Sequence, residues 1–287
     1  MKNFTLTLFF TLMAPLISYC QKQVIDAFTQ SAVLIQYTNG ASGSGLLVAD
    51  SNALYIVTAK HVIGEMSSKT NAFNLVGADA YIISYSNNAF SSTKDSMRID
   101  LVSLYNTGMV RTHKQQDIAV IKIANVLSNK VNADFSYSPT YKYLPGVAKI
   151  KSTPGMSGMF RDLTAKFNEV DAGDDAYMFG YPKSLKLEGQ SDYDYDRPLL
   201  RKGIIAGIDV NYKTIIVDCP SYQGNSGGPL FVISEDKKKI GVIGIVSRSV
   251  IQVEYLTNSY YKYNNVNISN SGYTVIIPIE FAFELMK

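Results

Sequence analysis

The chain contains few cysteines and histidines and has little excess charge. Its 287 residues include only the cysteines Cys20 and Cys219 and the histidines His61 and His113, and the formal net charge is +3. There is no stripe of Lys and Arg, so the sequence predicts no nucleic-acid partner. It also indicates no metal and no cofactor. The acidic stretch at residues 192–196 is most simply an exposed loop, because hard cations need several convergent oxygens.

The N-terminal residues 1–20 differ from the rest of the chain. Lys2 precedes an apolar run from Phe4 to Ile17, and Ser18-Tyr19-Cys20 follows it. This pattern predicts a signal peptide cut after Cys20, and the apolar run is short for a membrane span. We therefore expect an exported protein, periplasmic or secreted, with no membrane span in the mature chain. A lipid anchor at Cys20 is the alternative. After cleavage only Cys219 remains, so no disulfide can form within the mature chain.

The most informative stretch is Gly224-Asn225-Ser226-Gly227-Gly228-Pro229. It lies between two short apolar runs, which predicts a tight loop between strands. Its glycines permit backbone angles that side chains forbid, and they leave backbone N–H groups accessible. A serine on such a loop, beside amide donors, is typical of an acyl-transfer nucleophile. We therefore take Ser226 as the candidate nucleophile.

The chain also offers a general base and an orienting acid. His61 lies in the β-rich run Ile56–Ile63, and Asp117 stands where a polar stretch meets the apolar run Ile118–Ile123. Asp100 is the rival acid, but it lies within an expected strand rather than at the start of one. His113 is expected in a surface loop, and Cys219 is expected to be a buried strand thiol rather than a nucleophile.

The segments VTAKHVI, DIAVIKI and GNSGGPLF follow one another in the order His, Asp, Ser. Together they resemble the trypsin/chymotrypsin-like serine endopeptidases, nearest the disulfide-free bacterial branch that includes HtrA/Deg and glutamyl endopeptidases. We expect no PDZ module of the kind that many Deg-type proteases carry. The resemblance implies catalysis by His61, Asp117 and Ser226, with an oxyanion hole formed by the N–H groups of Gly224 and Ser226. Because the base must be neutral, activity is expected to fall at acidic pH. The alternative is a non-enzymatic peptide-binding module on a protease-like scaffold.

The resemblance also points to the residues that bind a protein or peptide substrate. The base of the primary pocket corresponds to Pro220, which is not acidic, so a preference for Lys or Arg is unsupported. Arg248 either favours an acidic substrate residue or points into solvent. Asn225 stands where activated trypsins have Asp, so we expect no zymogen of that kind. The expected substrate-binding residues are Pro220, Ser221, Tyr222, Gln223, Ser247, Arg248 and Ser249.

The spacing of apolar and turn residues predicts an all-β chain with two sets of six short strands, each of which fits an antiparallel β-barrel, and a short C-terminal helix. The resemblance implies that the two six-stranded barrels pack together as in the chymotrypsin-like fold. The first barrel is expected over residues 21–125 and the second over 173–287, separated by a connection and insertion at 126–172. A helical turn is expected at 59–64 and the closing helix at 278–285. The expected strands are 32–38, 45–49, 54–58, 80–85, 99–104 and 118–123, then 176–179, 199–208, 213–217, 230–233, 242–246 and 273–278.

Overall fold

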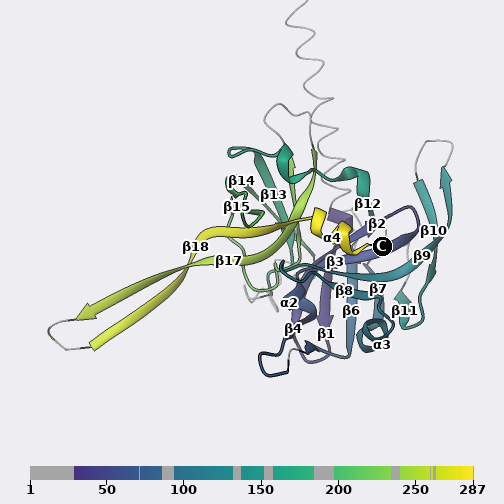
Figure 1. Ribbon diagram of the computed structural model, residues 1–287, viewed down its shortest axis with the longest axis horizontal. Helices are drawn as coiled ribbons and strands as arrows, with labels where there is room; N and C mark the ends of the chain where they lie inside the picture. The colour runs from purple at the N-terminus through teal and green to yellow at the C-terminus, as the bar shows by residue number, and fades with distance from the viewer. Residues whose placement is uncertain are drawn as a thin grey trace, which may run out of the picture.

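Figure 1 shows the computed structural model of the chain. It describes residues 29–70, 72–85, 94–131, 137–151, 158–183, 197–233, 240–258, 260 and 263–286. The expected signal peptide with Cys20, and the acidic stretch at 192–196, lie outside these residues. No helix within the described ranges has the length and apolar character needed to cross a bilayer.

The N-terminal half is built on a ten-stranded sheet. Its main path runs β10-β9-β3-β2-β1-β6-β7-β11, with β12 paired to β2 and β8 paired to β9. A separate small sheet pairs β4 with β5. The strands are β1 (Ala32–Tyr37), β2 (Ser42–Ala49), β3 (Ala53–Thr58), β4 (Gly64–Met66), β5 (Phe73–Leu75), β6 (Asp79–Tyr85), β7 (Lys94–Asp100), β8 (Val110–Thr112), β9 (Ala119–Val131), β10 (Tyr137–Tyr143), β11 (Val147–Lys151) and β12 (Met159–Phe160).

The C-terminal half is a closed barrel in the order β13-β14-β15-β18-β17-β16. All its neighbouring strands are antiparallel. Both β17 and β18 extend far beyond the barrel as a projecting hairpin (Figure 1). The strands are β13 (Asp175–Gly180), β14 (Leu199–Asp209), β15 (Thr214–Asp218), β16 (Pro229–Ile233), β17 (Ile240–Asn258) and β18 (Tyr263–Pro278).

The predicted all-β, chymotrypsin-like fold is confirmed, with one difference in the first half. Its sheet is open in the described residues, with β10 and β11 at the two ends of the path, and it has more than six strands. Of the added strands, β8 lies within the expected first barrel, and β10, β11 and β12 lie in the expected connection. There β9 continues to Val131 and pairs with β10, while β11 pairs with β7. Two short 3₁₀ turns, η1 (Arg161–Leu163) and η2 (Phe167–Glu169), lead into the second barrel.

A shared core holds the two halves together. Leu46 and Ile56 of the first half belong to the same buried cluster as Phe179 and Phe231 of the second. Phe179 and Phe231 also stack with ring centroids 5.3 Å apart. Burial of large side chains contributes about 1.5–3 kcal/mol each, so this continuous cluster resists separation of the halves.

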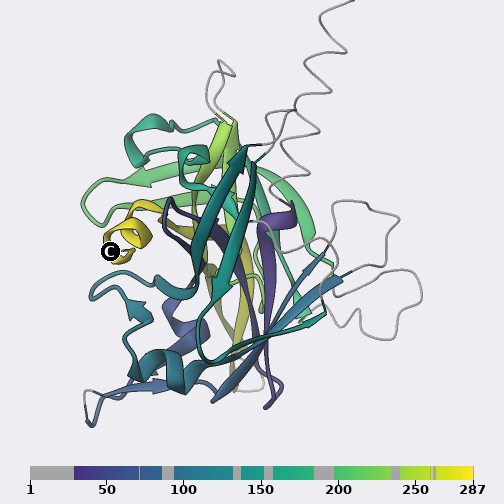
Figure 2. The ribbon, with the colours of Figure 1, turned by 90° about the vertical axis from the view of Figure 1, so that its right-hand side faces the viewer.

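The C-terminal helix α4 (Glu280–Leu285) is present where it was predicted and lies between the two halves (Figures 1 and 2). The guanidinium of Arg111, from the first half, donates to the carbonyl of Leu285 at 3.0 Å. The carboxylate of Glu280 accepts from the N–H of Phe167 at 3.1 Å. The ring of His113 packs on Phe281 with centroids 5.0 Å apart. His113 is therefore mostly buried, with a 15% exposed side chain, and the expectation of a surface residue was wrong.

The segment expected as a strand at 99–104 changes structure at Asp100. Strand β7 ends there and helix α3 (Leu101–Asn106) begins. The carboxylate of Asp100 accepts from the N–H of Ser103 at 2.9 Å, which is an N-cap bond. Asp100 is thus occupied at a helix start and does not contact His61, so the rival for the orienting acid has a structural role instead.

The cap predicts a measurable effect on stability. Asp100→Ala is expected to lower the free energy of unfolding by about 1 kcal/mol, because one N–H of the first helical turn loses its acceptor. Urea unfolding of the two proteins measures this difference. Asp100→Asn keeps an acceptor and is expected to unfold like the parent, whereas equal loss in both variants would contradict a capping role.

Candidate active site

Two adjacent strands bring His61 and Asp117 together. Helix α2 (Lys60–Ile63) is a single turn directly after β3, and Asp117 lies just before β9. Because β3 and β9 are antiparallel neighbours with Thr58 opposite Ala119, the end of one strand meets the start of the other. The imidazole Nδ1 of His61 lies 2.8 Å from Oδ2 of Asp117, and the N–H of His61 donates to Oδ1 at 3.1 Å. One carboxylate thus holds both the ring and the backbone of His61.

A third group fixes Asp117 from the other half of the molecule. The hydroxyl of Ser247, on β17, donates to Oδ2 of Asp117 at 2.6 Å. Burial by itself raises the pKa of Asp117, but the hydrogen bonds from His61 and Ser247 and the charge of His61 outweigh it. The pKa of this carboxyl is therefore held below its usual value of 3.8. Asp117 remains ionised in the folded protein.

This lowered pKa predicts an acid-dependent loss of stability. A carboxyl with a lower pKa in the folded state binds its proton more weakly there, so its stabilising effect is complete above about pH 4 and disappears as the pH falls through the folded pKa. Asp117→Asn removes this titration. Urea unfolding from pH 5 to pH 2 is expected to show a steeper fall for the parent than for the variant, and parallel curves would contradict the assignment.

The loop at 224–228 presents Ser226 between two glycines with positive φ, Gly224 (+98°) and Gly227 (+83°). A Cβ on Gly224 would lie 2.2 Å from the carbonyl oxygen of Tyr181, and one on Gly227 would lie 2.1 Å from Oγ1 of Thr58. No side chain fits at either position. The glycines are therefore required both by backbone angle and by close contact with both halves.

Asn225 holds the loop from within. It is buried, its side-chain oxygen accepts from the N–H of Tyr222 at 3.1 Å, and its own N–H donates to the carbonyl of Tyr222 at 2.9 Å. A Cβ on Gly180 would lie 2.4 Å from the Asn225 amide nitrogen, so the side chain packs directly on β13. The loop is thus fixed without an ion pair at Asn225.

Ser44 of β2 connects the serine loop to the first half. Its hydroxyl donates to the carbonyl of Gly224 at 2.6 Å and accepts from the N–H of Tyr181 at 3.0 Å. Its N–H donates to the carbonyl of Ser226 at 2.8 Å. The sequence alone assigned no role to Ser44. These three bonds make it a positioning residue for the loop.

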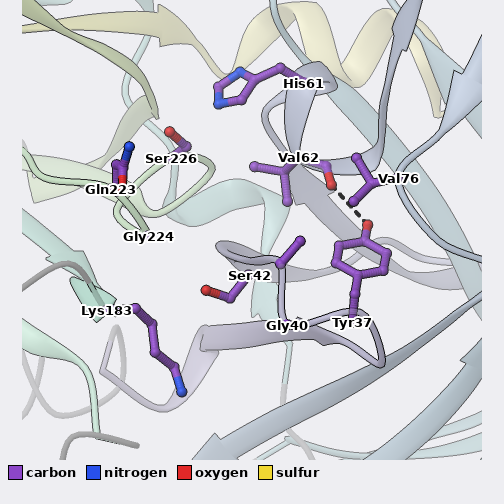
Figure 3. Close-up of a pocket in the computed structure, with 11 residues that line it drawn as sticks. Tyr37, Gly40, Ser42, His61, Val62, Val76, Lys183, Gln223, Gly224 and Ser226 are labelled. Carbon is purple, nitrogen blue, oxygen red and sulfur yellow. Dashed lines mark hydrogen bonds between the residues drawn. The ribbon is translucent and has the colours of Figure 1, made fainter. Parts of the chain in front are cut away.

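Ser226 and His61 face each other across one cleft (Figure 3). The Ser226 hydroxyl donates to the carbonyl of Ser247 at 3.3 Å, a long hydrogen bond that the hydroxyl can exchange for another acceptor by turning about its Cβ–Oγ bond. Among the described residues, neither the N–H of Gly224 nor that of Ser226 has a hydrogen-bond acceptor. Two amide donors beside a serine hydroxyl are available to bind an anionic oxygen.

The cleft continues on both sides of these residues as two cavities. A cavity of about 500 Å³ contains most of the expected substrate-binding set, and Pro220 is the one member that does not line it. The other cavity, of about 480 Å³, shares His61, Gln223 and Ser226 with the first. It is also lined by residues that the sequence did not single out, among them Tyr37, Ser42 and Lys183 (Figure 3). The first cavity, of about 500 Å³, is lined by His61, Asp117, Ser221, Tyr222, Gln223, Ser226, Ser247, Arg248 and Ser249.

Ser221, which lines the first cavity, is held by hydrogen bonds from residues behind it. Oγ1 of Thr274 lies 2.9 Å from the buried hydroxyl of Ser221 and donates to the carbonyl of Cys219 at 2.6 Å. The amide of Asn270 donates to the carbonyl of Ser221 at 2.6 Å. Cys219 is buried, and burial raises the pKa of its thiol, so it is a poor nucleophile. Pro220 is exposed, and its carbonyl accepts from the guanidinium of Arg201.

Arg248 is exposed at this cavity, while the neighbouring Ser247 is buried against Asp117. Within the ranges that the structure describes, no group of three or more His, Cys, Asp or Glu side chains is arranged to hold a metal ion.

Comparison with known proteins agrees with this arrangement. Residues 43–245 match the family model of the trypsin-like peptidase domain, which spans more than half of the chain. The chain therefore belongs to the trypsin-like peptidase family, a family of serine proteases. No curated protein matches it.

Solved structures with a similar fold include human heparin-binding protein, with 10% identity, 90% of each chain covered and a TM-score of 0.50. Deg5 is 15% identical over 91% of this chain and 90% of its own, with a TM-score of 0.49. The HtrA-type protease AlgW with tripeptide is 14% identical over 92% of this chain and 62% of its own, with a TM-score of 0.46. At these identities the likeness to heparin-binding protein supports the fold alone.

Proposed function

We propose that the chain is an endopeptidase that hydrolyses peptide bonds through Ser226, His61 and Asp117. The observation that carries the proposal is the Asp117 carboxylate bonded to the ring of His61, which faces the hydroxyl of Ser226 in one open cleft. This is the arrangement that nucleophilic acyl transfer requires: a nucleophile, a base and a group that orients the base.

In the proposed first step, Oγ of Ser226 attacks the substrate carbonyl carbon, and the Oγ proton passes to Nε2 of His61. The carbonyl oxygen becomes an oxyanion held by the N–H groups of Gly224 and Ser226. The C–N bond then breaks, and the imidazolium proton goes to the leaving amine. Asp117 keeps the proton on Nδ1 throughout, which leaves Nε2 free to accept.

In the second step, water attacks the acyl-enzyme and gives its proton to Nε2 of His61. The ester bond breaks, the proton returns to Oγ of Ser226, and the acid product leaves. Each oxyanion-hole donor contributes about 3 kcal/mol to such a reaction.

The residues that line the first cavity support a preference for substrate side chains other than Lys and Arg. No carboxylate other than Asp117 lines the first cavity, and Pro220, which was expected at the pocket base, does not line it. Asp117 is already bonded to His61 and Ser247. Arg248 is the exposed cation at the cavity, and we propose that it disfavours basic substrate residues near the scissile bond.

Hydrolysis of casein by the purified protein tests this function. Fragments are expected from the parent and none from Ser226→Ala under the same conditions. Fragments produced equally by both would mean that the activity does not come from this site.

We also propose that the protein acts after export. The support is the pattern of residues 1–20, with its short apolar run and cut after Cys20. Mass spectrometry of the mature N-terminus distinguishes a plain Gln21 from a diacylglyceryl Cys20. An unprocessed Met1 would contradict export by this route.

A further inference from the structure

The hairpin formed by β17 and β18 extends well outside the second barrel (Figure 1). We call residues 251–258 with 263–270 the arm. Its strands pair in regular antiparallel register from Ile251 opposite Asn270 to Asn258 opposite Tyr263. The expected strands reached only 246 and 273, so the arm was not predicted. Its function is not accounted for by the barrel.

The strand that lines the cleft is the same strand that forms the arm. On one edge β17 is covered by β18 over most of its length. On the other edge it pairs with β16 only from Ile240 to Ile245. Beyond that point, no described strand covers this second edge. The open edge therefore begins beside Ser247, whose carbonyl accepts from Ser226, and continues to Asn258.

The two faces of the arm differ in chemistry. On one face Val253 lies opposite Ile268, and Tyr255 lies opposite Val266. These four side chains and Ile251 are 41–79% exposed. The other face carries the side chains of Gln252, Glu254 and Asn267, and the Glu254 carboxylate accepts from both amides at 2.9 and 3.1 Å. The apolar Leu256 lies on this face as well.

An arm of this kind is incomplete by itself. A two-stranded hairpin in water is marginally stable, and it gains stability from a third strand or from a surface that covers its apolar face. An uncovered strand edge beside exposed apolar side chains is also a template for another extended chain. The arm carries only one charged side chain among its described residues, Glu254, so it selects by backbone pairing and apolar contact rather than by charge.

We propose that the arm binds the substrate polypeptide as a third strand. An inference of this kind rests on the proposed function, because the scissile bond must lie at Ser226. The neighbours of β17 are all antiparallel, and an antiparallel peptide along its open edge runs from the arm toward the catalytic centre. The residues before the scissile bond therefore lie along the arm.

The length of the edge defines the substrate class. From Ser247 to Asn258 an extended chain spans about 40 Å, at about 3.4 Å per residue. The preferred substrates are accordingly unfolded or extended polypeptides with about ten residues before the cleaved bond. Apolar side chains at alternate positions match the apolar face of the arm, since alternate residues of a strand point to one side.

A peptide series tests the proposal. All members share one cleavage sequence; they have either four or twelve residues before the scissile bond, and the extension alternates Val and Thr. A control peptide carries the same eight extra residues after the scissile bond. The expected result is a kcat/KM at least ~10-fold higher for the long peptide, mainly through a lower KM, and no such gain for the control.

Variants of the arm provide the second measurement. Residues 253–268 are replaced by Asn-Gly, which joins the paired residues Gln252 and Ser269 through a two-residue turn. This variant is expected to cleave long and short peptides at similar kcat/KM. Val253→Lys on the apolar face is expected to reduce the length effect, and Gln252→Lys on the polar face is the matched control. Thermal unfolding of each variant verifies the fold.

A binding measurement tests the arm independently of hydrolysis. Fluorescence anisotropy with labelled peptides on Ser226→Ala is expected to give a lower Kd for the long peptide, and this gain is expected to be lost when the arm is shortened. Absence of cleavage together with arm-dependent binding would overturn the proposed function and keep the arm as a peptide site. If cleavage does not depend on the number of residues before the scissile bond, the arm proposal alone is overturned. The arm proposal is also overturned if the two peptides bind with equal affinity and sedimentation shows a dimer that forms only when the arm is present.

Discussion

Replacement of Ser226 by Ala is expected to lower kcat by about a millionfold, the largest effect of any single substitution in this chain. The hydroxyl is the atom that forms the acyl-enzyme, and no other nucleophile lines the cleft in a comparable position. Ser247 is bonded to Asp117, and Ser221 is buried beside Thr274. Initial rates with a chromogenic peptide, measured at high protein concentration, cover the required range.

A matched serine separates this effect from general damage. Ser51 is exposed in the turn between β2 and β3, so Ser51→Ala is expected to turn over substrate at the parent rate. Urea unfolding should show Ser226→Ala as stable as the parent within about 1 kcal/mol, because its hydroxyl makes one long hydrogen bond. A residual rate above one hundredth of the parent would remove Ser226 from the proposed role.

Asp117→Asn is expected to lower kcat by about ten-thousandfold while the fold is kept. An amide at this position donates a proton to Nδ1 of His61, which places the ring proton on Nε2. The ring then has no lone pair directed at Ser226 and cannot act as the base. Steady-state kinetics at saturating substrate measure the loss.

Asp100→Asn is the control for this variant. Its side chain keeps an acceptor for the N–H of Ser103, and no contact joins it to His61. It is therefore expected to retain the parent rate. Near-parent turnover by Asp117→Asn, or a large loss in Asp100→Asn, would contradict the assignment of the orienting acid.

The sequence was sufficient to predict the second barrel and the C-terminal helix. Strands such as β13 and β16 are short apolar runs between Gly and Pro signals, and their burial is nearly complete. The apolar pattern of each segment predicts a strand there because the inner face of these barrel strands is buried. The loop at Ser226 was predictable for a related reason: the glycines are required by the backbone angles at 224 and 227.

The parts that were missed depend on contacts between distant residues. Residues 99–104 resemble a strand in their apolar alternation, but the chain turns into helix α3 after Asp100. The hydrogen bond from the N–H of Ser103 to the Asp100 carboxylate, which caps this helix, is not visible in the apolar pattern. The pairing of β9 with β10 extends the first sheet through a segment rich in Tyr and Pro, which has no clear strand period. The role of Ser44 depends on its hydrogen bond to the carbonyl of Gly224, in the loop at 224–228, which is distant in the sequence.

The arm escaped prediction because its composition is typical of a loop. Residues 263–270 contain asparagine and serine at alternate positions, and turn residues of this kind normally indicate irregular structure. The apolar face combines Val266 and Ile268 with their partners Tyr255 and Val253 on β17, so this face is complete only when the two segments are paired.

The central claim is that Ser226 is activated by His61, and a fluorophosphonate probe tests it most directly. We expect intact mass to show one adduct per chain, with peptide mapping to Ser226, and no adduct in either Ser226→Ala or His61→Ala. No adduct on the folded parent protein, or an adduct on Ser226 that forms equally fast in His61→Ala, would contradict the account.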